Sequence, residues 1–228
     1  MSRLYDWTRD RLRSFYDARI DTPAILDRDR FFPHHRAFAE NWRAIRAECV
    51  EVMHDIGTVP HFHELMAEQE SLSRHGDRFW RMFVLRAYGV DQRENQAKLP
   101  FTTSLFKDRP EIKSVTLSFL EGHKHIPAHR GPFRGILRYH LGLVIPARAD
   151  GASSNRMRID GVMHELHEGA DLLWDDTYTH EVWNDSESVR AALLIDVVRS
   201  RMTLMPTLVT HLILLIVGVT VRIKGLRQ

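Results

Sequence analysis

The pattern of apolar and polar residues changes twice along this chain of 228 residues. Apolar residues recur every three or four positions from Phe38 to Val52, which is typical of one face of a helix. Further along, apolar residues alternate with polar ones, as they do in half-buried strands. We therefore assign residues 1–95 to a helical support region, residues 96–200 to a β core and residues 201–228 to an apolar C-terminal segment.

Short strands separated by turn residues fill the predicted core. Val115, Leu117 and Phe119 share one face of a strand, and the pair Asp160-Gly161 is typical of a β-hairpin turn. Further strands are predicted at residues 136–145, 157–159, 172–174, 181–183 and 191–198. Strands of this kind after a helical front indicate an α+β fold with a sandwich or barrel at its centre.

The C-terminal segment contains an apolar run of the length that crosses a bilayer. Residues 202–221 include no Asp, Glu, Lys or Arg, and basic residues flank them on both sides, with Arg201 before the run and Arg222, Lys224 and Arg227 after it. About 20 apolar residues cross a hydrocarbon core. Three interpretations stay open: a spanning helix, a helix lying in the membrane interface, and a helix packed on the barrel.

Composition excludes several classes of protein. The chain has 32 Lys+Arg against 30 Asp+Glu and no dense basic block, so we expect no nucleic-acid partner. Cys49 is the only cysteine and lies on the apolar stripe of the predicted helix, which excludes a thiolate metal cluster and indicates a core residue. The first residues contain no apolar run, so we expect neither a signal peptide nor a span there.

Two of the 14 histidines are candidate metal ligands. His129 and His180 each lie in a segment with strand and turn character. A common iron site combines two histidines with a carboxylate two residues after the first one, and Gly131 stands at that position here. Spacing alone therefore gives a weak iron signal. Asp175 and Asp176 precede the second histidine, and we interpret them as turn residues that support it.

Other histidines form short clusters without a partner cluster. His61 and His63 follow a proline in a predicted loop, and His123 and His125 flank Lys124. We interpret all of these as loop residues exposed to solvent.

The run HRGPFRGILRYHLGLVIP, followed by DDTYTHEVW and an arginine ten residues after the second histidine, resembles the aspartyl/asparaginyl β-hydroxylase family. The similarity covers residues 114–198. It implies an iron(II)- and 2-oxoglutarate-dependent dioxygenase that uses O2, built on a double-stranded β-helix, a jelly roll of the cupin type. Many members of this family have glycine where the carboxylate ligand is missing, so Gly131 agrees with the resemblance.

The resemblance also implies roles for individual residues. His129 and His180 correspond to the two iron ligands. Arg190 corresponds to the arginine that binds the far carboxylate of 2-oxoglutarate, a task that suits a planar guanidinium. Three more residues correspond to groups near the co-substrate, namely Ser118, Arg138 and His140. Without the resemblance, Arg190 would be interpreted as a surface arginine and Ser118 as a solvent-facing strand residue.

The chain departs from the animal peptide hydroxylases at several positions. Pro127-Ala128 stands where they have Trp-Pro, and Ile136 stands where they carry an arginine. The run PFRGILRYHLGL is closer to bacterial lipid A and ornithine-lipid hydroxylases, which hydroxylate the 2-position of an acyl chain. We therefore expect a lipid substrate and a membrane-associated protein on the cytoplasmic face of the inner membrane, or in the cytoplasm.

Two alternatives remain at this stage. The first is a peptidyl Asp/Asn hydroxylase, which would act on a peptide substrate. The second is a non-catalytic cupin-like binding module anchored by its C-terminal segment. Retention of both histidines together with Arg190 speaks against the second alternative.

Overall fold

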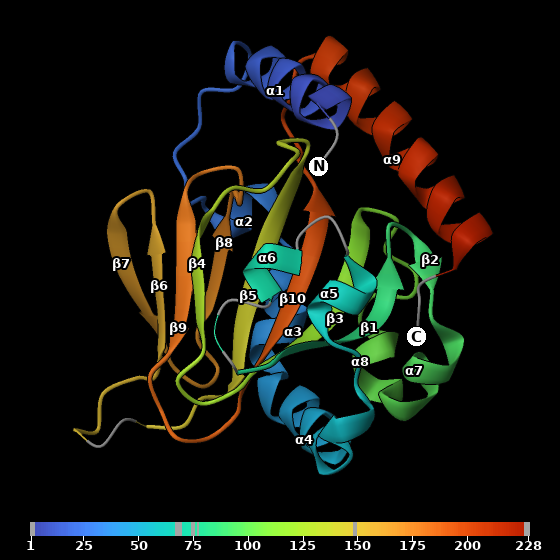
Figure 1. Cartoon of the computed structure of the whole chain (residues 1–228). Helices are drawn as coiled ribbons and strands as arrows, with labels where there is room; N and C mark the ends of the chain where they lie inside the picture. Colours follow the sequence, from blue (N-terminus) through green and yellow to red (C-terminus); the bar gives the residue numbers. More distant parts are fainter. Residues whose placement is uncertain (1–2, 67–69, 74–75, 77, 148–149, 226–228) are drawn as a thin grey trace.

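The protein is described by a computed structural model that covers residues 3–66, 70–73, 76, 78–147 and 150–225. Two antiparallel sheets face each other, and helices cover the outer face of the larger one (Figure 1). The strands of this core are β1 (Trp80–Ala87), β2 (Val90–Asp91), β3 (Ile112–Leu120), β4 (His125–His129), β5 (Ile136–Val144), β6 (Asn155–Ile159), β7 (Val162–Leu166), β8 (Asp171–Trp174), β9 (His180–Asn184) and β10 (Arg190–Val198). This arrangement confirms the predicted α+β fold with a jelly-roll core.

The larger sheet has the order β2-β1-β3-β10-β5-β8, and the smaller sheet has the order β4-β9-β6-β7. Strand β10 is central, between β3 and β5, so its ends are fixed by pairing on both sides. The predicted hairpin is β6–β7, whose turn residues Asp160 and Gly161 have φ values of 49° and 81°. Positive φ at both central positions is what a type I′ turn requires.

The helical front is more fragmented than the sequence pattern predicts. The predicted stripe from Phe38 to Val52 is divided between two helices, because Asn41 ends the first and its side-chain amide donates to the Ala37 carbonyl. Among the described residues the helical elements are α1 (Arg3–Asp17), α2 (Arg28–Phe31), α3 (His35–Glu40), α4 (Trp42–His54), the 3-10 turn η1 (Ile56–Thr58), α5 (Phe62–Leu65), α6 (Glu70–Ser73), α7 (Arg93–Lys98), α8 (Pro100–Ser104) and α9 (Leu204–Lys224).

The division of the chain at residue 95 stays a prediction, but strands and helices do not segregate there. Strands β1 and β2 precede that position and belong to the six-stranded sheet, whereas α7 and α8 lie within 96–200 or overlap its start. Helix α8 is fixed to α4 because the Glu48 carboxylate accepts hydrogen bonds from the backbone N–H groups of Phe101 and Thr102, at 2.7 and 2.8 Å.

The outer and inner faces of the large sheet have different partners. Val115, Leu117 and Phe119 of β3 are fully buried in the main core against the helices, together with Cys49, which confirms its predicted core position. Since side chains alternate along a strand, the residues between them face the smaller sheet and line the interior of the barrel.

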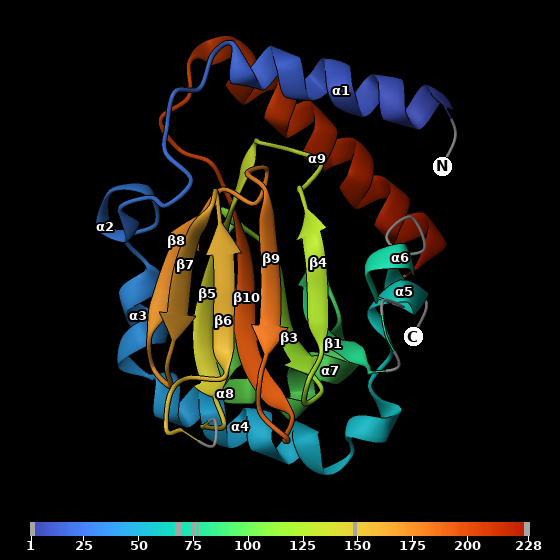
Figure 2. The same ribbon diagram turned by 60° about the vertical axis from the view of Figure 1, so that its left-hand side comes forward.

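The C-terminal helix α9 lies against the body of the protein along one face. In both views it runs beside α1 at one end of the barrel (Figures 1 and 2). Thr210 and Leu214 are buried, and the Tyr16 hydroxyl lies 2.8 Å from the Thr210 hydroxyl. A Cβ on Gly135 would lie 2.5 Å from that Thr210 oxygen, so only glycine permits this close approach. Lys224 ends α9, and Arg227 lies outside the described residues.

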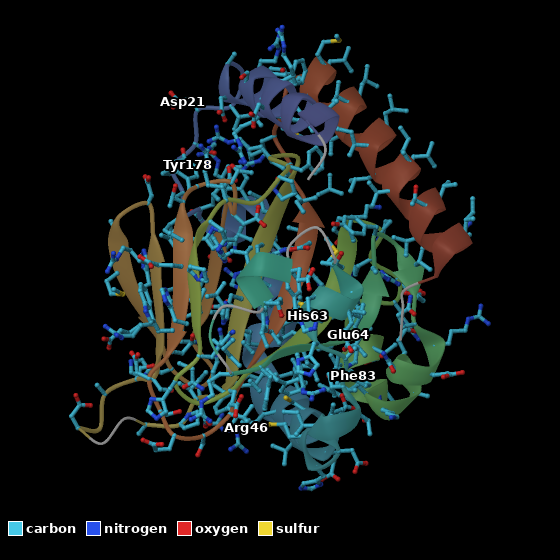
Figure 3. All side chains as sticks on the ribbon, viewed as in Figure 1. Asp21, Arg46, His63, Glu64, Phe83 and Tyr178 are labelled. Atoms are coloured by element: carbon cyan, nitrogen blue, oxygen red, sulfur yellow. The ribbon has the colours of Figure 1, made fainter. Side chains whose placement is uncertain are left out.

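A buried ion network fixes the segment between β8 and β9. Asp175 is fully buried, and its carboxylate accepts hydrogen bonds from Arg199 and, at 2.9 Å, from Arg134. Arg134 also reaches the Tyr178 hydroxyl, which in turn donates to the Thr22 carbonyl. Figure 3 shows Tyr178 beside the segment after α1, close to Asp21. The network therefore joins the N-terminal segment, β10 and the turn that leads to His180.

We expect Asp175→Asn to lower the free energy of unfolding by about 3–5 kcal/mol, because it leaves buried guanidinium groups without their shared carboxylate. Urea unfolding followed by circular dichroism measures the change. The matched control is Asp185→Asn, whose ion pair with Arg156 is partly exposed and should contribute about 1 kcal/mol or less. Equal losses in the two variants would contradict the role of the buried network.

Candidate active site

The two candidate ligand histidines are cross-strand partners. His129 ends β4 and His180 begins β9, and the two residues pair directly in the antiparallel register. Their ring centroids are 4.0 Å apart, with an angle of 56° between the ring planes. The structure thus brings together two imidazoles that are far apart in the sequence.

Each imidazole has one nitrogen fixed by the backbone. Nδ1 of His129 lies 2.8 Å from the Pro127 carbonyl, and Nδ1 of His180 lies 2.9 Å from the Tyr178 carbonyl. A carbonyl oxygen only accepts hydrogen bonds, so each Nδ1 carries the proton and each Nε2 has a free lone pair in the neutral ring. Burial lowers the pKa of His129, and burial together with His129 holds the pKa of His180 well below its usual value. Both rings are therefore neutral at pH 7.

Strand β4 can present His129 because it is an edge strand. Pro127 lies within it and has no N–H for a sheet, which is tolerated only at an edge. The β4–β9 register shifts between Ile126 and His129, so the strand bends just before the histidine. On the other side of the pair, the ring of Trp174 meets His180 edge-on at 4.5 Å.

Asp176 occupies the space that a side chain at position 131 would need. A Cβ on Gly131 would lie 2.2 Å from Oδ1 of Asp176, and the Gly131 N–H donates to the Asp176 carbonyl at 2.6 Å. The glycine is therefore required by packing. In the part of the chain that the structure describes, no group of three His, Cys, Asp or Glu side chains could hold a metal ion. The candidate metal centre consists of two imidazoles.

Asp176 was interpreted from the sequence as a turn residue, and its place in the cavity was missed. Its carboxylate is 7% exposed and lies 3.3 Å from Nη1 of Arg138. The same guanidinium makes two hydrogen bonds to Asp196, at 2.8 and 3.1 Å. Arg138 thus lines the same cavity as the histidines, and two carboxylates already occupy its donors. The only sequence signal for Asp176 was its position four residues before His180.

Arg190, Ser118 and His140 lie deeper in the barrel, on the inward faces of β10, β3 and β5. The register places them on one patch, since Ala192, two residues after Arg190, pairs with Ser118, and Leu194 pairs with His140. All three are buried, with exposures of 2%. This burial excludes the alternative interpretations of Arg190 as a surface arginine and of Ser118 as a solvent-facing residue.

Arg190 is a buried cation without a counterion among the described residues. Its Nε and Nη1 atoms have no hydrogen-bond partner there, and neither does Nε2 of His140. Burial lowers the pKa of Arg190 to about 10, and burial, followed by Arg190, holds the pKa of His140 well below its usual value. An unpaired buried charge is costly. A bound carboxylate beside Arg190 would offset that cost.

A cavity of about 160 Å³ lies in front of the histidine pair. Its walls combine the histidines and Arg138 with a larger apolar area from α5, β1 and the residues after β4. The apolar residues of this lining are Phe62, Leu65, Met66, Trp80, Met82, Val84, Ala87, Pro132, Phe133 and Ile136. The second arginine of the lining, Arg86, is bonded to Asp91 at 2.6 Å.

The other histidine clusters lie elsewhere. His125 stacks on Trp183, with ring centroids 4.8 Å apart, and lies 3.2 Å from Glu181. Lys124 was expected to be solvated, but it is 1% exposed and its ammonium donates to the Ser73 carbonyl at 2.8 Å. Figure 3 shows His63 beside Glu64 on α5, where His61 and His63 stack on each other at 5.2 Å.

Burial raises the pKa of Asp176 to about 6, against about 3.9 for an aspartate in an unfolded chain. Between these values the folded chain binds more protons at Asp176 than the unfolded chain does, so the free energy of unfolding falls as pH rises. Between pH 4 and 6.5 this decrease in the free energy of unfolding amounts to up to about 3 kcal/mol. We expect Asp176→Asn to abolish it, because an asparagine side chain does not titrate. Urea unfolding of the metal-free proteins measures it, and parallel pH curves would contradict the raised pKa.

Comparison with known proteins identifies the family of the chain. The sequence profile described as Aspartyl/Asparaginyl beta-hydroxylase matches residues 39–200. An ornithine lipid ester-linked acyl 2-hydroxylase from Rhizobium tropici is 32% identical over 182 residues, which are 80% of this chain and 63% of that protein. The aspartyl/asparaginyl beta-hydroxylase of Homo sapiens is 32% identical over 174 residues, which are 74% of this chain and 21% of that protein.

The chain therefore spans less than two thirds of the length of these relatives. Among solved structures, a Pseudomonas putida prolyl-4-hydroxylase is similar with a TM-score of 0.43 and 17% identity, covering 72% of this chain and 88% of that one. The match of the family profile to more than half of the chain shows that the protein belongs to the aspartyl/asparaginyl β-hydroxylase family.

Proposed function

We propose that this protein is an iron(II)- and 2-oxoglutarate-dependent dioxygenase that hydroxylates an unactivated carbon of a lipid acyl chain. The observation that carries the proposal is a pair of neutral, facing imidazoles at the mouth of a barrel that also buries an unpaired arginine. In the overall reaction one atom of O2 enters a C–H bond as a hydroxyl group. The other enters 2-oxoglutarate, which leaves as succinate and CO2.

The residues present fit an iron(II) ion. His129 and His180 would hold it through their Nε2 atoms, since backbone carbonyls fix both Nδ1 atoms. Imidazole nitrogen suits Fe(II), and such a hydrogen bond on the second nitrogen orients a ligand histidine. The bound ion with its co-substrate supplies the oxidising power of the reaction.

Arg190 is the group we assign to the far carboxylate of 2-oxoglutarate. Its Nε and Nη1 donors are unpaired and can bind a carboxylate, and no carboxylate of the described chain competes for them. Ser118, whose hydroxyl accepts from the Trp80 indole N–H at 3.0 Å, lies on the same patch and can still donate. His140 is neutral and adds a further polar atom beside Arg190.

Arg138 takes a different part in the proposal from the one that the resemblance implies. Its guanidinium holds Asp176 and Asp196 together at the cavity wall. We propose that Arg138 positions Asp176 next to the histidine pair. Arg138 would then influence the co-substrate through its ion pairs with Asp176 and Asp196, and not by binding the co-substrate itself.

The character of the cavity favours an acyl chain over a peptide. Most of its lining is apolar, and its two arginines, Arg86 and Arg138, are already paired with carboxylates. A peptidyl aspartate would need an unpaired cation at that place. The relative from Rhizobium tropici that acts on an ester-linked acyl chain supports the same substrate class.

We further propose that the protein acts at a membrane surface, on its cytoplasmic face, with α9 lying in the interface. Residues 204–223 contain an 18-residue window with a mean hydropathy of 2.2, and by length and composition the helix suffices to cross a membrane. One face of the helix, however, is buried against the protein by Thr210 and Leu214. A helix fixed to the body in this way is better suited to lie on the bilayer than to span it.

Anaerobic addition of iron(II) and 2-oxoglutarate to the full-length protein should give a weak visible charge-transfer band. His129→Ala and His180→Ala should abolish it, whereas His125→Ala, which alters the same strand outside the site, should keep it. Arg190→Lys should raise the 2-oxoglutarate concentration needed for half of the band by about tenfold or more. A normal band in either ligand variant would contradict the assigned metal site.

The substrate class is tested by mass spectrometry of products. With iron(II), 2-oxoglutarate and O2, the protein should add one oxygen to the acyl chain of ornithine lipid or lipid A in mixed vesicles. Peptides that contain Asp and Asn serve as the competing substrate, and the His180→Ala protein is the control. Hydroxylated peptide together with unchanged lipid would replace the acyl chain with a peptide substrate.

A further inference from the structure

A groove of about 250 Å³ lies between α1, α9 and the turn after β1. It shares Tyr88, Pro132 and Phe133 with the cavity in front of the histidines. The two hollows are therefore neighbours that meet at these three residues. One wall of the meeting point belongs to the segment that follows His129 in the chain.

The groove is almost entirely apolar. Leu12 of α1 and Ile213, Leu214 and Val217 of α9 form its sides, and Thr8 is the polar residue at its rim. Leu214 and Phe133 also pack in the small core that fixes α9 to the barrel. The groove is consequently a built feature between two docked helices, and its position depends on the docking of α9.

The outer face of α9 continues the apolar surface away from the groove. In Figure 3 its side chains project into open space. The exposed large apolar residues of α9 are Leu204, Met205, Leu208, Leu212, Leu215, Ile216, Val219 and Ile223. An apolar face of this size marks contact with a partner or a membrane. Arg201 and Arg222, exposed at the two ends of the helix, complement anionic headgroups.

We propose that the groove holds the methylene tail of the membrane lipid whose carboxyl-end carbons lie in the cavity at His129 and His180. The tail then runs between α1 and α9 back to the bilayer, in which the outer face of α9 is immersed. This inference rests on the proposed acyl-chain hydroxylation and deepens it. Each methylene group kept from water contributes about 0.8 kcal/mol, so a groove continuous with the bilayer lets a long chain reach the site without crossing water.

The occupant follows from the continuity of the surfaces. A groove that joined only the cavity would suit a soluble ligand, and one that joined only α9 would suit a partner helix. This groove meets the cavity at Tyr88 and Phe133, and the exposed face of α9 lies beside its other wall. An acyl chain is the ligand that is apolar throughout and anchored in a bilayer at one end of its path.

Photolabelling tests the proposal without depending on turnover. Full-length protein is bound to vesicles of phosphatidylethanolamine and phosphatidylglycerol that contain a phospholipid with a diazirine in its acyl chain. After illumination, mass spectrometry should locate label at Tyr88 and at Pro132-Phe133, as well as on the outer face of α9. Label confined to the outer face would overturn the groove as a tail site.

Two matched tryptophan variants sharpen the test. Val217→Trp fills the groove and should reduce labelling at Phe133 by roughly tenfold, which corresponds to about 1.4 kcal/mol of lost binding. Leu212→Trp lies on the exposed face of the same helix and should leave that labelling unchanged. Leu12→Trp fills the groove from α1 and covers the case in which Val217→Trp fails to fold. Undiminished labelling of Phe133 in a folded, groove-filling variant would overturn the proposal.

The experiments distinguish an error in the proposed groove from an error in the proposed function. Vesicle lipid that gains oxygen while Tyr88 and Phe133 remain unlabelled would remove the groove and leave the hydroxylase. Label at both residues without oxygen on any lipid would support the groove as an acyl-chain site and remove the proposed hydroxylation of lipid.

Discussion

The pairing of β4 with β9 is the constraint on which the site depends. It sets His129 directly opposite His180, so that two imidazoles share one point at the mouth of the barrel. The pairing also fixes their chemistry, since the backbone carbonyls of both strand ends hold the protons on Nδ1. A slip of one residue would turn each ring to the other face of its strand. The register therefore serves as the primary determinant of the candidate metal centre.

The buried charged residues of the barrel interior have different roles. Asp175 is enclosed by Arg134 and Arg199 and stabilises the turn before His180, whereas Asp176 faces the cavity beside Arg138. Asp175 and Asp176 thus form ion pairs with arginines of the protein itself. Arg190 differs because the described chain provides no carboxylate for it. We propose that Arg190 receives its anion from a bound ligand.

The helices at the end of the barrel connect this interior to the surface. Helix α9 is held by Thr210 and Leu214 on one face and leaves an apolar face outward, and α1 runs beside it (Figure 2). The cavity and the groove share Phe133, so in the proposed function the docking of α9 would determine the path of an apolar substrate to the histidines. Under that proposal, membrane contact and access to the site depend on the same helix.

The sequence by itself determined the strand periods, the Asp160-Gly161 turn and the apolar tail, and it identified the two histidines and Arg190 as candidate site residues through their spacing within a family pattern. These features depend on local propensities and on short motifs, which can be recognised in a single sequence. Only the tertiary structure decided that Asp176 fills the space beside Gly131, that Arg138 is already paired, and that α9 lies against the barrel. Each of these facts depends on residues distant in the sequence meeting in a close-packed interior, and no local pattern encodes such meetings.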